Sequence, residues 1–373
     1  MNIADILSEH ARDRAGHPAI EDGARVVTYG ELDDLVDAAT ANLQVAGIEP
    51  GDTVAVLLED SADHLIILCA LARAGAVVFS LNSNASKAEL VSSLASVAVK
   101  AAITFGGRLS DNDLLWLRAG DICQSASPPF DGKITGDDDP LMLIQSSGTT
   151  GAPKSFLRSH AELAEWIARY TRGHGWAADE RNLSLIRMSF NVGRHIAFGM
   201  LRLGATVVIS HAQNHDELAA LVSCKRVSYI MLTPSHLIPL LSYAAGKTPL
   251  FPDLRAMVVV SAPITHAQRL LARERLTPNF IEQLAANESG LLTLAFPADQ
   301  DAYPDSVGRV VVGIEAQVVD DEDRPLPTGE VGLTRFRGTG YPMHYLDDAQ
   351  ATARAFRGGW FYPGDLCALN DDG

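Results

Sequence analysis

Short apolar runs of strand length recur along most of this chain, and longer amphipathic segments separate them. Parallel strands need crossover connections, and those connections are usually helices. The alternation therefore favours largely parallel sheets covered by helices. The expected strands are residues 53–58, 76–79, 101–105, 141–145, 206–210, 229–232 and 256–260.

Beyond about Pro297 the pattern changes to short β-type runs at residues 307–312, 316–319 and 331–336, with Gly and Pro between them. Such runs are typical of a β-rich lobe. The sequence thus predicts an α/β fold with two largely parallel sheets flanked by helices, as flavodoxin-like subdomains, plus a small barrel-like β-rich lobe. We expect the α/β subdomains at about residues 1–185 and 186–297 and the lobe at 298–373.

The composition fits a globular protein and disfavours polyanionic partners. The 373 residues are 47% hydrophobic and 20% charged, which allows a sizeable core, and the formal net charge is -16. This charge opposes nucleic acid and anionic membrane surfaces, so we expect neither as a partner. The longest apolar stretch, residues 65–79, contains Arg73 and Gly75 and predicts a buried helix that runs into a strand. The charged, amphipathic N-terminus lacks the features of a secretory signal, which favours the cytoplasm.

The cysteines and histidines show no metal-binding or disulfide pattern. The four cysteines lie far apart among apolar residues, which predicts reduced thiols. The histidines include no HExxH motif or Cys/His cluster, so a zinc site is disfavoured. Acidic runs at 137–139, 320–323 and 370–372 stand beside Gly or Pro, and hydrated turns explain them better than a metal cluster does.

The segment LMLIQSSGTTGAPK, residues 141–154, places a polar loop directly after an expected buried strand. In α/β sheets, ligands bind at the carboxyl ends of such strands. The hydroxyls, glycines and lysine of this loop suit a polyphosphate, because backbone amides can approach its oxygens and the ammonium adds charge. These residues are Ser146, Ser147, Gly148, Thr149, Thr150, Gly151 and Lys154. A helix is expected next, because Ser159 and Glu162 have the spacing of a capping box.

Two other interpretations of this loop compete with a polyphosphate strap. Gly148, Lys154 and Ser155 have the spacing of a Walker A motif, but Pro153 occupies the position that must be glycine. Proline lacks an amide N–H, so the tight amide nest of that motif cannot form. A Ser/Gly linker would explain the composition, yet a linker needs neither four hydroxyls nor a lysine after a buried strand.

The loop resembles the signature loop of the adenylate-forming superfamily, which includes acyl-CoA synthetases, aryl-acid ligases and the adenylation domains of peptide synthetases. Further segments, spread essentially from end to end, are similar to blocks of this family and follow the family's order. They are TYGEL (28–32), GIEPGDTVAVLLEDS (47–61), ALARAGAVVFSLN (70–82), LTPSHLIPLL (232–241), SAPI (261–264), GEVGLTRFRGTGY (329–341) and GGWFYPGDL (358–366).

The resemblance implies that a carboxylate attacks the α-phosphate of ATP, which gives an acyl-adenylate and pyrophosphate, and that CoA or a phosphopantetheine carrier accepts the acyl group. The loop would hold the β- and γ-phosphates, with Thr149 and Lys154 among the catalytic residues. In QLAANESG (283–290), Glu288 corresponds to the glutamate that helps hold Mg²⁺, a cation that prefers oxygen ligands. Asn287 stands where a catalytic threonine usually contacts the α-phosphate. Taken alone, Glu288 could be an exposed residue at a helix end.

The same resemblance implies an adenosine site. Leu284 occupies the position of an aromatic ring that stacks on adenine, so this chain loses the stacking. Small residues are similar to the family loop along the adenine edge, and they are Ser261, Ala262 and Pro263. Asp365 matches the aspartate that accepts hydrogen bonds from the ribose hydroxyls, while Pro363 replaces the usual threonine. Taken alone, Gly364 and Asp365 fit an ordinary turn equally well.

The segment MSFNVGRH, residues 188–195, bears on the acid. Amino-acid-activating relatives carry an aspartate where this chain has Asn191, so an amino acid is disfavoured. An aromatic or bulky hydrophobic acid fits better, because some aryl-acid ligases carry Asn here and because small residues leave room. The residues expected to contact the acid are Asn191, Gly193, Ala285 and Ala286. Arg194 and His195 fit a satisfied surface pair somewhat better than ligand contacts.

Members of this family continue beyond the segment similar to GDL into a small C-terminal domain that supplies a further lysine. This chain ends at Gly373, so the resemblance implies a large N-terminal domain that binds ATP or an acyl-adenylate but turns over poorly by itself. Two alternatives stay open. One is a stand-alone adenylation protein that loads a carrier protein, and the other is a non-catalytic adenylate-binding relative, which Leu284 and Pro363 favour.

Overall fold

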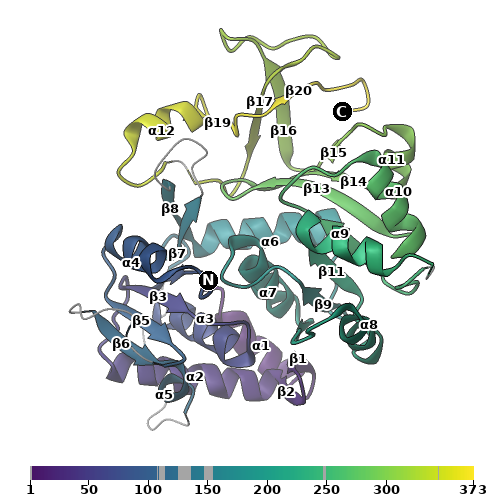
Figure 1. The fold of residues 1–373 in the computed structure, drawn as a ribbon. Helices are drawn as coiled ribbons and strands as arrows, with labels where there is room; N and C mark the ends of the chain where they lie inside the picture. The colour runs from purple at the N-terminus through teal and green to yellow at the C-terminus, as the bar shows by residue number, and fades with distance from the viewer. Residues whose placement is uncertain are drawn as a thin grey trace.

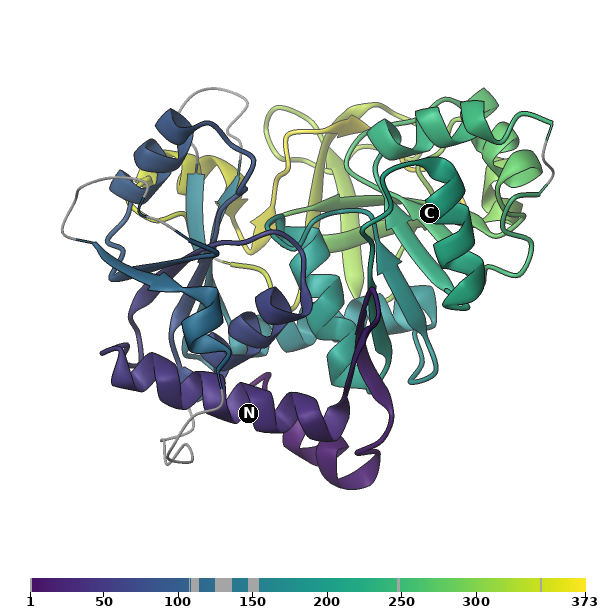
Figure 2. The ribbon, with the colours of Figure 1, turned by 60° about the horizontal axis from the view of Figure 1, so that its bottom comes forward.

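The structure is a computed structural model that describes residues 2–106, 108, 114–124, 136–146, 154–246, 249–342 and 344–373. The described strands form three sheets of six, nine and five strands (Figures 1 and 2). None of the helices in these ranges is long and apolar enough to cross a membrane.

The six-stranded sheet has the order β6-β5-β3-β4-β7-β8. Its strands are β3 (Thr53–Leu57), β4 (Val77–Ser80), β5 (Ala101–Thr104), β6 (Leu115–Arg118), β7 (Pro140–Ser146) and β8 (Lys154–Ser159). All neighbours pair in parallel except β7 and β8, which pair antiparallel. The helices α1 (Asp5–Asp13), α2 (Tyr29–Val45), α3 (Ala62–Ala74), α4 (Lys87–Ala95) and α5 (Ala119–Ile122) belong to this half of the chain.

The nine-stranded sheet has the order β15-β14-β13-β12-β11-β9-β10-β1-β2. Its strands are β1 (Pro18–Asp22), β2 (Arg25–Thr28), β9 (Arg181–Ser184), β10 (Thr206–Ile209), β11 (Tyr229–Leu232), β12 (Ala256–Val259), β13 (Phe280–Ala286), β14 (Gly290–Ala295) and β15 (Arg309–Val310). The central strands from β13 to β1 are parallel, and the strands at both ends are antiparallel. Because β1 and β2 join this sheet from the start of the chain, subdomain boundaries near 185 and 297 stay a prediction.

Helices cover both faces of the nine-stranded sheet. On one face lie α6 (His160–His174) and α7 (Asn191–Leu203), whose apolar residues join a large core that also contains α3 and residues of the six-stranded sheet. On the other face, α8 (His215–Cys224), α9 (Pro234–Tyr243) and α10 (His266–Arg275) form a second core, and α11 (Pro297–Ala302) follows β14. Burial of these apolar side chains is the main stabilising term of the fold.

The remaining strands form a small antiparallel sheet, as the change of pattern after Pro297 predicts. They are β16 (Ile314–Val319), β17 (Gly332–Gly338), β18 (Phe356–Arg357), β19 (Trp360–Phe361) and β20 (Leu366–Cys367), and α12 (Ala349–Ala355) precedes β18. Among the described residues the pairings run β16-β17-β19-β18, with β20 on β17, which is an open sheet and no closed barrel.

All seven strands expected in the α/β part are present, and α3 is the buried helix that runs into β4. The capping box of α6 is also confirmed, since Ser159 Oγ accepts from the backbone N–H of Glu162 at 3.2 Å and Glu162 Oε2 accepts from that of Ser159 at 2.8 Å. One element differs from expectation. The chain does not pass from the loop directly into a helix, because residues 154–159 form β8. The sequence of this strand, KSFLRS, is mostly polar, although its Phe156 is buried.

Candidate active site

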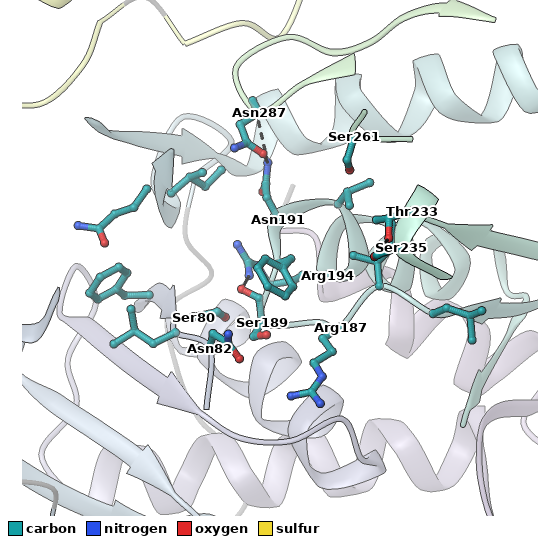
Figure 3. A pocket seen from close by; sticks show the side chains of 18 of the residues that line it. Ser80, Asn82, Arg187, Ser189, Asn191, Arg194, Thr233, Ser235, Ser261 and Asn287 are labelled. Carbon is teal, nitrogen blue, oxygen red and sulfur yellow. Dashed lines mark hydrogen bonds between the residues drawn. The ribbon is translucent and has the colours of Figure 1, made fainter. Parts of the chain in front are cut away.

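A cavity of about 630 Å³ lies where several parallel strands end. Ser80 ends β4, Gln145 lies near the end of β7, Thr233 follows β11 and Ser261 follows β12. The carboxyl edges of the two sheets therefore face one shared space, the location at which open α/β sheets bind ligands. Figure 3 shows the polar side chains from both sheets around this cavity.

Asn191 and Asn287 meet at one end of this cavity (Figure 3). Asn191 is the first residue of α7, and Asn287 lies in the turn between β13 and β14. Asn191 Nδ2 donates to the Oδ1 atom of Asn287 at 3.3 Å and to its carbonyl oxygen at 3.4 Å. The two amides thus fix each other, and Ser261 also lines the cavity.

Two buried arginines hold the turn that carries Asn287. Arg158, which is completely buried, donates to the carbonyl oxygens of Asn287 at 2.8 Å and Glu288 at 3.0 Å. Arg169 donates to the carbonyl of Ser289 at 2.6 Å. Burial lowers the pKa of Arg158 to about 10, and Arg169 adds like-charge repulsion. Both guanidinium groups therefore stay cationic at neutral pH and orient this turn through charge-assisted hydrogen bonds.

Glu288 lies in this β-hairpin turn and is only 8% exposed, so it is no exposed helix-end residue. Tyr345 Oη donates to Glu288 Oε1 at 2.7 Å. Burial, and secondarily the charge of Glu288, raises the pKa of Tyr345, so its hydroxyl remains a donor. Within the described part of the chain, no three His, Cys, Asp or Glu side chains cluster as metal ligands. A cation at Glu288 would therefore need oxygens from a ligand.

The predicted phosphate loop connects the two strands of the β7–β8 hairpin. Ser146 and Lys154 are paired at the ends of these strands, and the Lys154 Nζ atom lies 5.2 Å from the centre of the Tyr345 ring. Lys154 thus lies over the ring of the tyrosine whose hydroxyl donates to Glu288. The other predicted loop residues, Ser147, Gly148, Thr149, Thr150 and Gly151, lie outside the described residues.

The predicted adenosine residues fall into two groups. Ser261, Ala262 and Pro263 are exposed after β12, and Ser261 has a φ of 86°, a left-handed conformation that is uncommon for serine. Leu284 lines a separate cavity of about 340 Å³, together with Thr334 and Leu366. Asp365 is exposed beside it, and its carbonyl oxygen accepts from the backbone N–H of Thr334 at 2.9 Å. The structure brings Leu284 near the residue after Asp365, but it places neither in the 630 Å³ cavity.

The predicted acid-binding residues also separate. Only Asn191 lines the main cavity, while Gly193 lines a neighbouring one. A Cβ atom at Gly193 would lie 2.4 Å from the carbonyl oxygens of Ile186 and Arg187, so this glycine permits close packing of α7 on that segment. Ala285 and Ala286 are half-buried on β13, where they pack against the main core.

The interpretation of Arg194 and His195 as a surface pair is wrong. Arg194 is 2% exposed and lines the main cavity, and His195 is fully buried with its ring edge toward Trp166. The error has a physical reason. Both residues follow a polar helix start, and their burial depends on the six-stranded sheet packing against α7, which the local sequence does not reveal.

Sequence reasoning missed several polar residues of this site. Ser80 ends β4 and Asn82 follows it, at the same sheet edge as the loop, so the rule that located the loop could have found them. Arg158, Arg169 and Tyr345 carried no such signal, because they reach the turn at 287–289 from distant parts of the chain.

Comparison with known proteins gives a consistent result. A family model described as AMP-binding enzyme matches residues 7–346. Phosphinothricin tripeptide synthetase PhsC of Streptomyces viridochromogenes is 28% identical over 364 residues, which covers 94% of this chain and 32% of that protein. Feruloyl-CoA synthase of an Amycolatopsis species is 27% identical over 373 residues, covering 95% of this chain and 74% of that protein. This chain thus spans about a third of the length of the synthetase.

The fold has a solved counterpart. The structure of o-succinylbenzoate CoA synthetase from Bacillus subtilis, in complex with its acyl-adenylate intermediate, matches with a TM-score of 0.91 at 19% identity. The match covers 99% of this chain and 97% of that chain. At this identity the likeness shows the fold.

Proposed function

The chain belongs to the family of AMP-binding enzymes, and on that premise we propose that it activates a carboxylic acid with ATP. A carboxylate oxygen attacks the α-phosphorus, the bond from that phosphorus to the bridging oxygen of the β-phosphate breaks, and pyrophosphate leaves. The product is an acyl-adenylate for transfer to the thiol of CoA or of a carrier protein. Two anions must meet in this step, so the chain's task is positioning and charge neutralisation.

The observation that carries the proposal is the convergence of Asn191, Asn287 and Ser261 on one cavity, with Glu288 buried beside it. The amide of Asn287 can donate a hydrogen bond to an α-phosphate oxygen, and the Asn191 amide keeps it oriented. Lys154 stands at the end of the loop that would hold the β- and γ-phosphates, where its ammonium would offset negative charge.

Glu288 fits the expectation for Mg²⁺ together with ATP. Mg²⁺ is usually held by one or two carboxylates plus substrate phosphates, and Glu288 is a buried carboxylate whose Oε1 atom Tyr345 orients. A bound Mg²⁺ would neutralise charge on the phosphates. Tyr345, through its hydrogen bond, holds Glu288 in a fixed direction.

The acid that fits best is aromatic or bulky and hydrophobic. Apolar side chains make up much of the cavity wall, among them Leu143, Ile144 and Phe190. Asn191 offers no negative charge for a substrate ammonium. A relative named feruloyl-CoA synthase agrees with an aromatic acid. The relative named as a peptide synthetase favours the second candidate, an adenylation protein that loads a carrier protein. We place both activities in the cytoplasm.

A binding experiment tests the proposal. Calorimetry with an aroyl sulfamoyl adenosine, a stable mimic of the acyl-adenylate, should show saturable binding. Asn287→Ala removes the amide expected at the α-phosphate and should weaken binding about tenfold. Asn42→Ala, on the remote helix α2, is the matched control and should bind normally. If no aroyl analogue and no MgATP binds, the proposal fails.

A second assay distinguishes an enzyme from a non-catalytic relative. Acid-dependent exchange of labelled pyrophosphate into ATP reports formation of the adenylate. Glu288→Gln keeps an acceptor for Tyr345 but removes the negative charge, so its Mg²⁺ requirement for ATP binding should rise about tenfold or more. Tight analogue binding without exchange for any acid would instead support the non-catalytic relative.

A further inference from the structure

Arg194 points its guanidinium at the wall of the main cavity. Its Nη1 atom donates to the carbonyl oxygens of Met188 at 3.1 Å and Ser189 at 3.4 Å, and its Nε atom lies 3.4 Å from the Sδ atom of Met142. Only 2% of the residue is exposed. The side chain is therefore held in place by the segment that precedes α7 and by β7.

No acidic side chain of the described residues forms an ion pair with this buried cation. The groups that its guanidinium contacts in that part of the chain are two carbonyl oxygens and a thioether sulfur. Desolvation lowers its pKa to about 10, and the nearby charge of Arg158 acts in the same direction. The neighbouring His195 is kept neutral by burial, which lowers its pKa. An unpaired buried charge is costly, so it is expected to meet an acceptor in the functional complex.

Three further polar residues form the cavity wall near Arg194. Ser80, Asn82 and Ser189 line it, and Figure 3 shows them together with Arg194, away from the Asn191–Asn287 pair. In the described part of the chain, the Oγ atoms of Ser80 and Ser189 are buried without a hydrogen-bond partner. Buried polar atoms normally have partners, so these hydroxyls also point to an oxygen-bearing ligand group.

We propose that Arg194, with Ser80 and Ser189, binds a second oxygen substituent of the acid, a carboxylate or a phenolic oxygen, and thereby determines which acid is chosen. This inference rests on the proposed function, because the reacting carboxylate is assigned to the Asn287 end of the cavity. The acid then reaches from Asn287 to Arg194, and its apolar body contacts Leu81 and Val192. The Asn287 end of the cavity thus binds the reacting carboxylate, and the Arg194 end selects among acids by their second substituent.

The test uses a series of sulfamoyl adenosine analogues. The series contains the benzoyl compound and its ortho, meta and para hydroxy and carboxy derivatives, each measured by calorimetry. The native chain should bind at least one substituted analogue more tightly than the benzoyl compound. In Arg194→Gln this preference should fall about 10- to 100-fold, as expected for loss of a charged hydrogen bond, while benzoyl binding changes less than about threefold. Arg194→Lys should keep part of the preference.

Controls separate this role from structural support of residues 188–189. Arg187→Gln removes an exposed arginine that also lines the cavity, and it should leave the preference within about twofold because its charge is solvated. Melting temperatures are measured for all variants. Equal weakening of every analogue in Arg194→Gln, or an unchanged preference, overturns the inference while the proposed function stands. Failure of all analogues, the benzoyl compound included, refutes the proposed function itself.

Discussion

Arg158→Met should destabilise the protein and displace the turn that carries Asn287 and Glu288. The guanidinium supplies hydrogen bonds to the carbonyl oxygens of Asn287, Glu288 and Gly340, at 2.8, 3.0 and 3.2 Å. A buried carbonyl left without a donor costs about 1–3 kcal/mol. The first two carbonyls together therefore give a gross loss of about 2–6 kcal/mol.

An opposing effect reduces this loss. Burial lowers the pKa of Arg158 from 12.5 to about 10, and a lowering of that size corresponds to about 3 kcal/mol of unfavourable charge burial. Methionine fills a similar volume against Phe156 without that cost. The net change is the difference between these two figures, so we expect the free energy of unfolding to fall by up to about 3 kcal/mol. Urea unfolding followed by tryptophan fluorescence measures the change, and m should stay constant.

Binding of the aroyl sulfamoyl adenosine should weaken more than stability alone explains. A shift of the turn by about 1 Å can cost up to 100-fold in a positioned interaction, and we expect a loss of about tenfold or more. Arg269→Met is the matched control. Arg269 is equally buried but pairs with Glu282, so its loss destabilises the fold without touching the turn. Normal binding by Arg158→Met at a temperature where it is folded would refute the positioning argument.

Two further predictions concern stability. Burial lowers the pKa of His174 to about 4, from an unfolded value of 6.5, so the unfolded chain binds the extra proton and stability is lost as pH falls from 6.5 towards 4. At pH 5 this amounts to about 2 kcal/mol. Between pH 6.5 and 5 the native protein should therefore lose about 2 kcal/mol more of its free energy of unfolding, measured by urea titration, than His174→Gln does. Equal losses in the two proteins would contradict the prediction. Gly290→Ala should cost about 2–4 kcal/mol, because Gly290 has a φ of 71° and a Cβ would lie 2.4 Å from the Trp166 ring. Gly23→Ala, with a φ of 60° and open space, should cost only about 1 kcal/mol, and equal losses in the two variants would refute the clash.

The sequence allowed much of the fold to be predicted because its strands are short, apolar and bounded by polar segments. β10, β11 and β12 are buried on both faces, so nearly every residue in them is apolar. By contrast, β8 has the sequence KSFLRS, in which only two adjacent apolar residues stand between polar pairs, so it lacks the pattern of a strand. The order of strands across the sheets, including the pairing of β1 with β10, depends on contacts far apart in the chain.

Motifs in the sequence indicated several residues of the site, but they did not indicate which side chains are buried. Asn191, Ser261 and Asn287 were predictable from their motifs, and they line one cavity. The burial of Arg194 was not predictable, because a charged residue near a helix start is usually exposed and only tertiary packing reverses that preference. Leu284 lines a different cavity from these three residues, and its assignment to adenine stays a prediction.

Glu288 depends on all three sheets for its position. The β13–β14 turn that contains it belongs to the nine-stranded sheet, and Arg158, which holds the turn, comes from β8 in the six-stranded sheet. Tyr345, which donates to its carboxylate, follows β17 of the small sheet and also lies beside Lys154. Any change in how the sheets pack would therefore alter the distance between Lys154 and Glu288. The activity proposed for this chain is thus a property of the packed sheets, because no single motif contains both charges together with the groups that orient them.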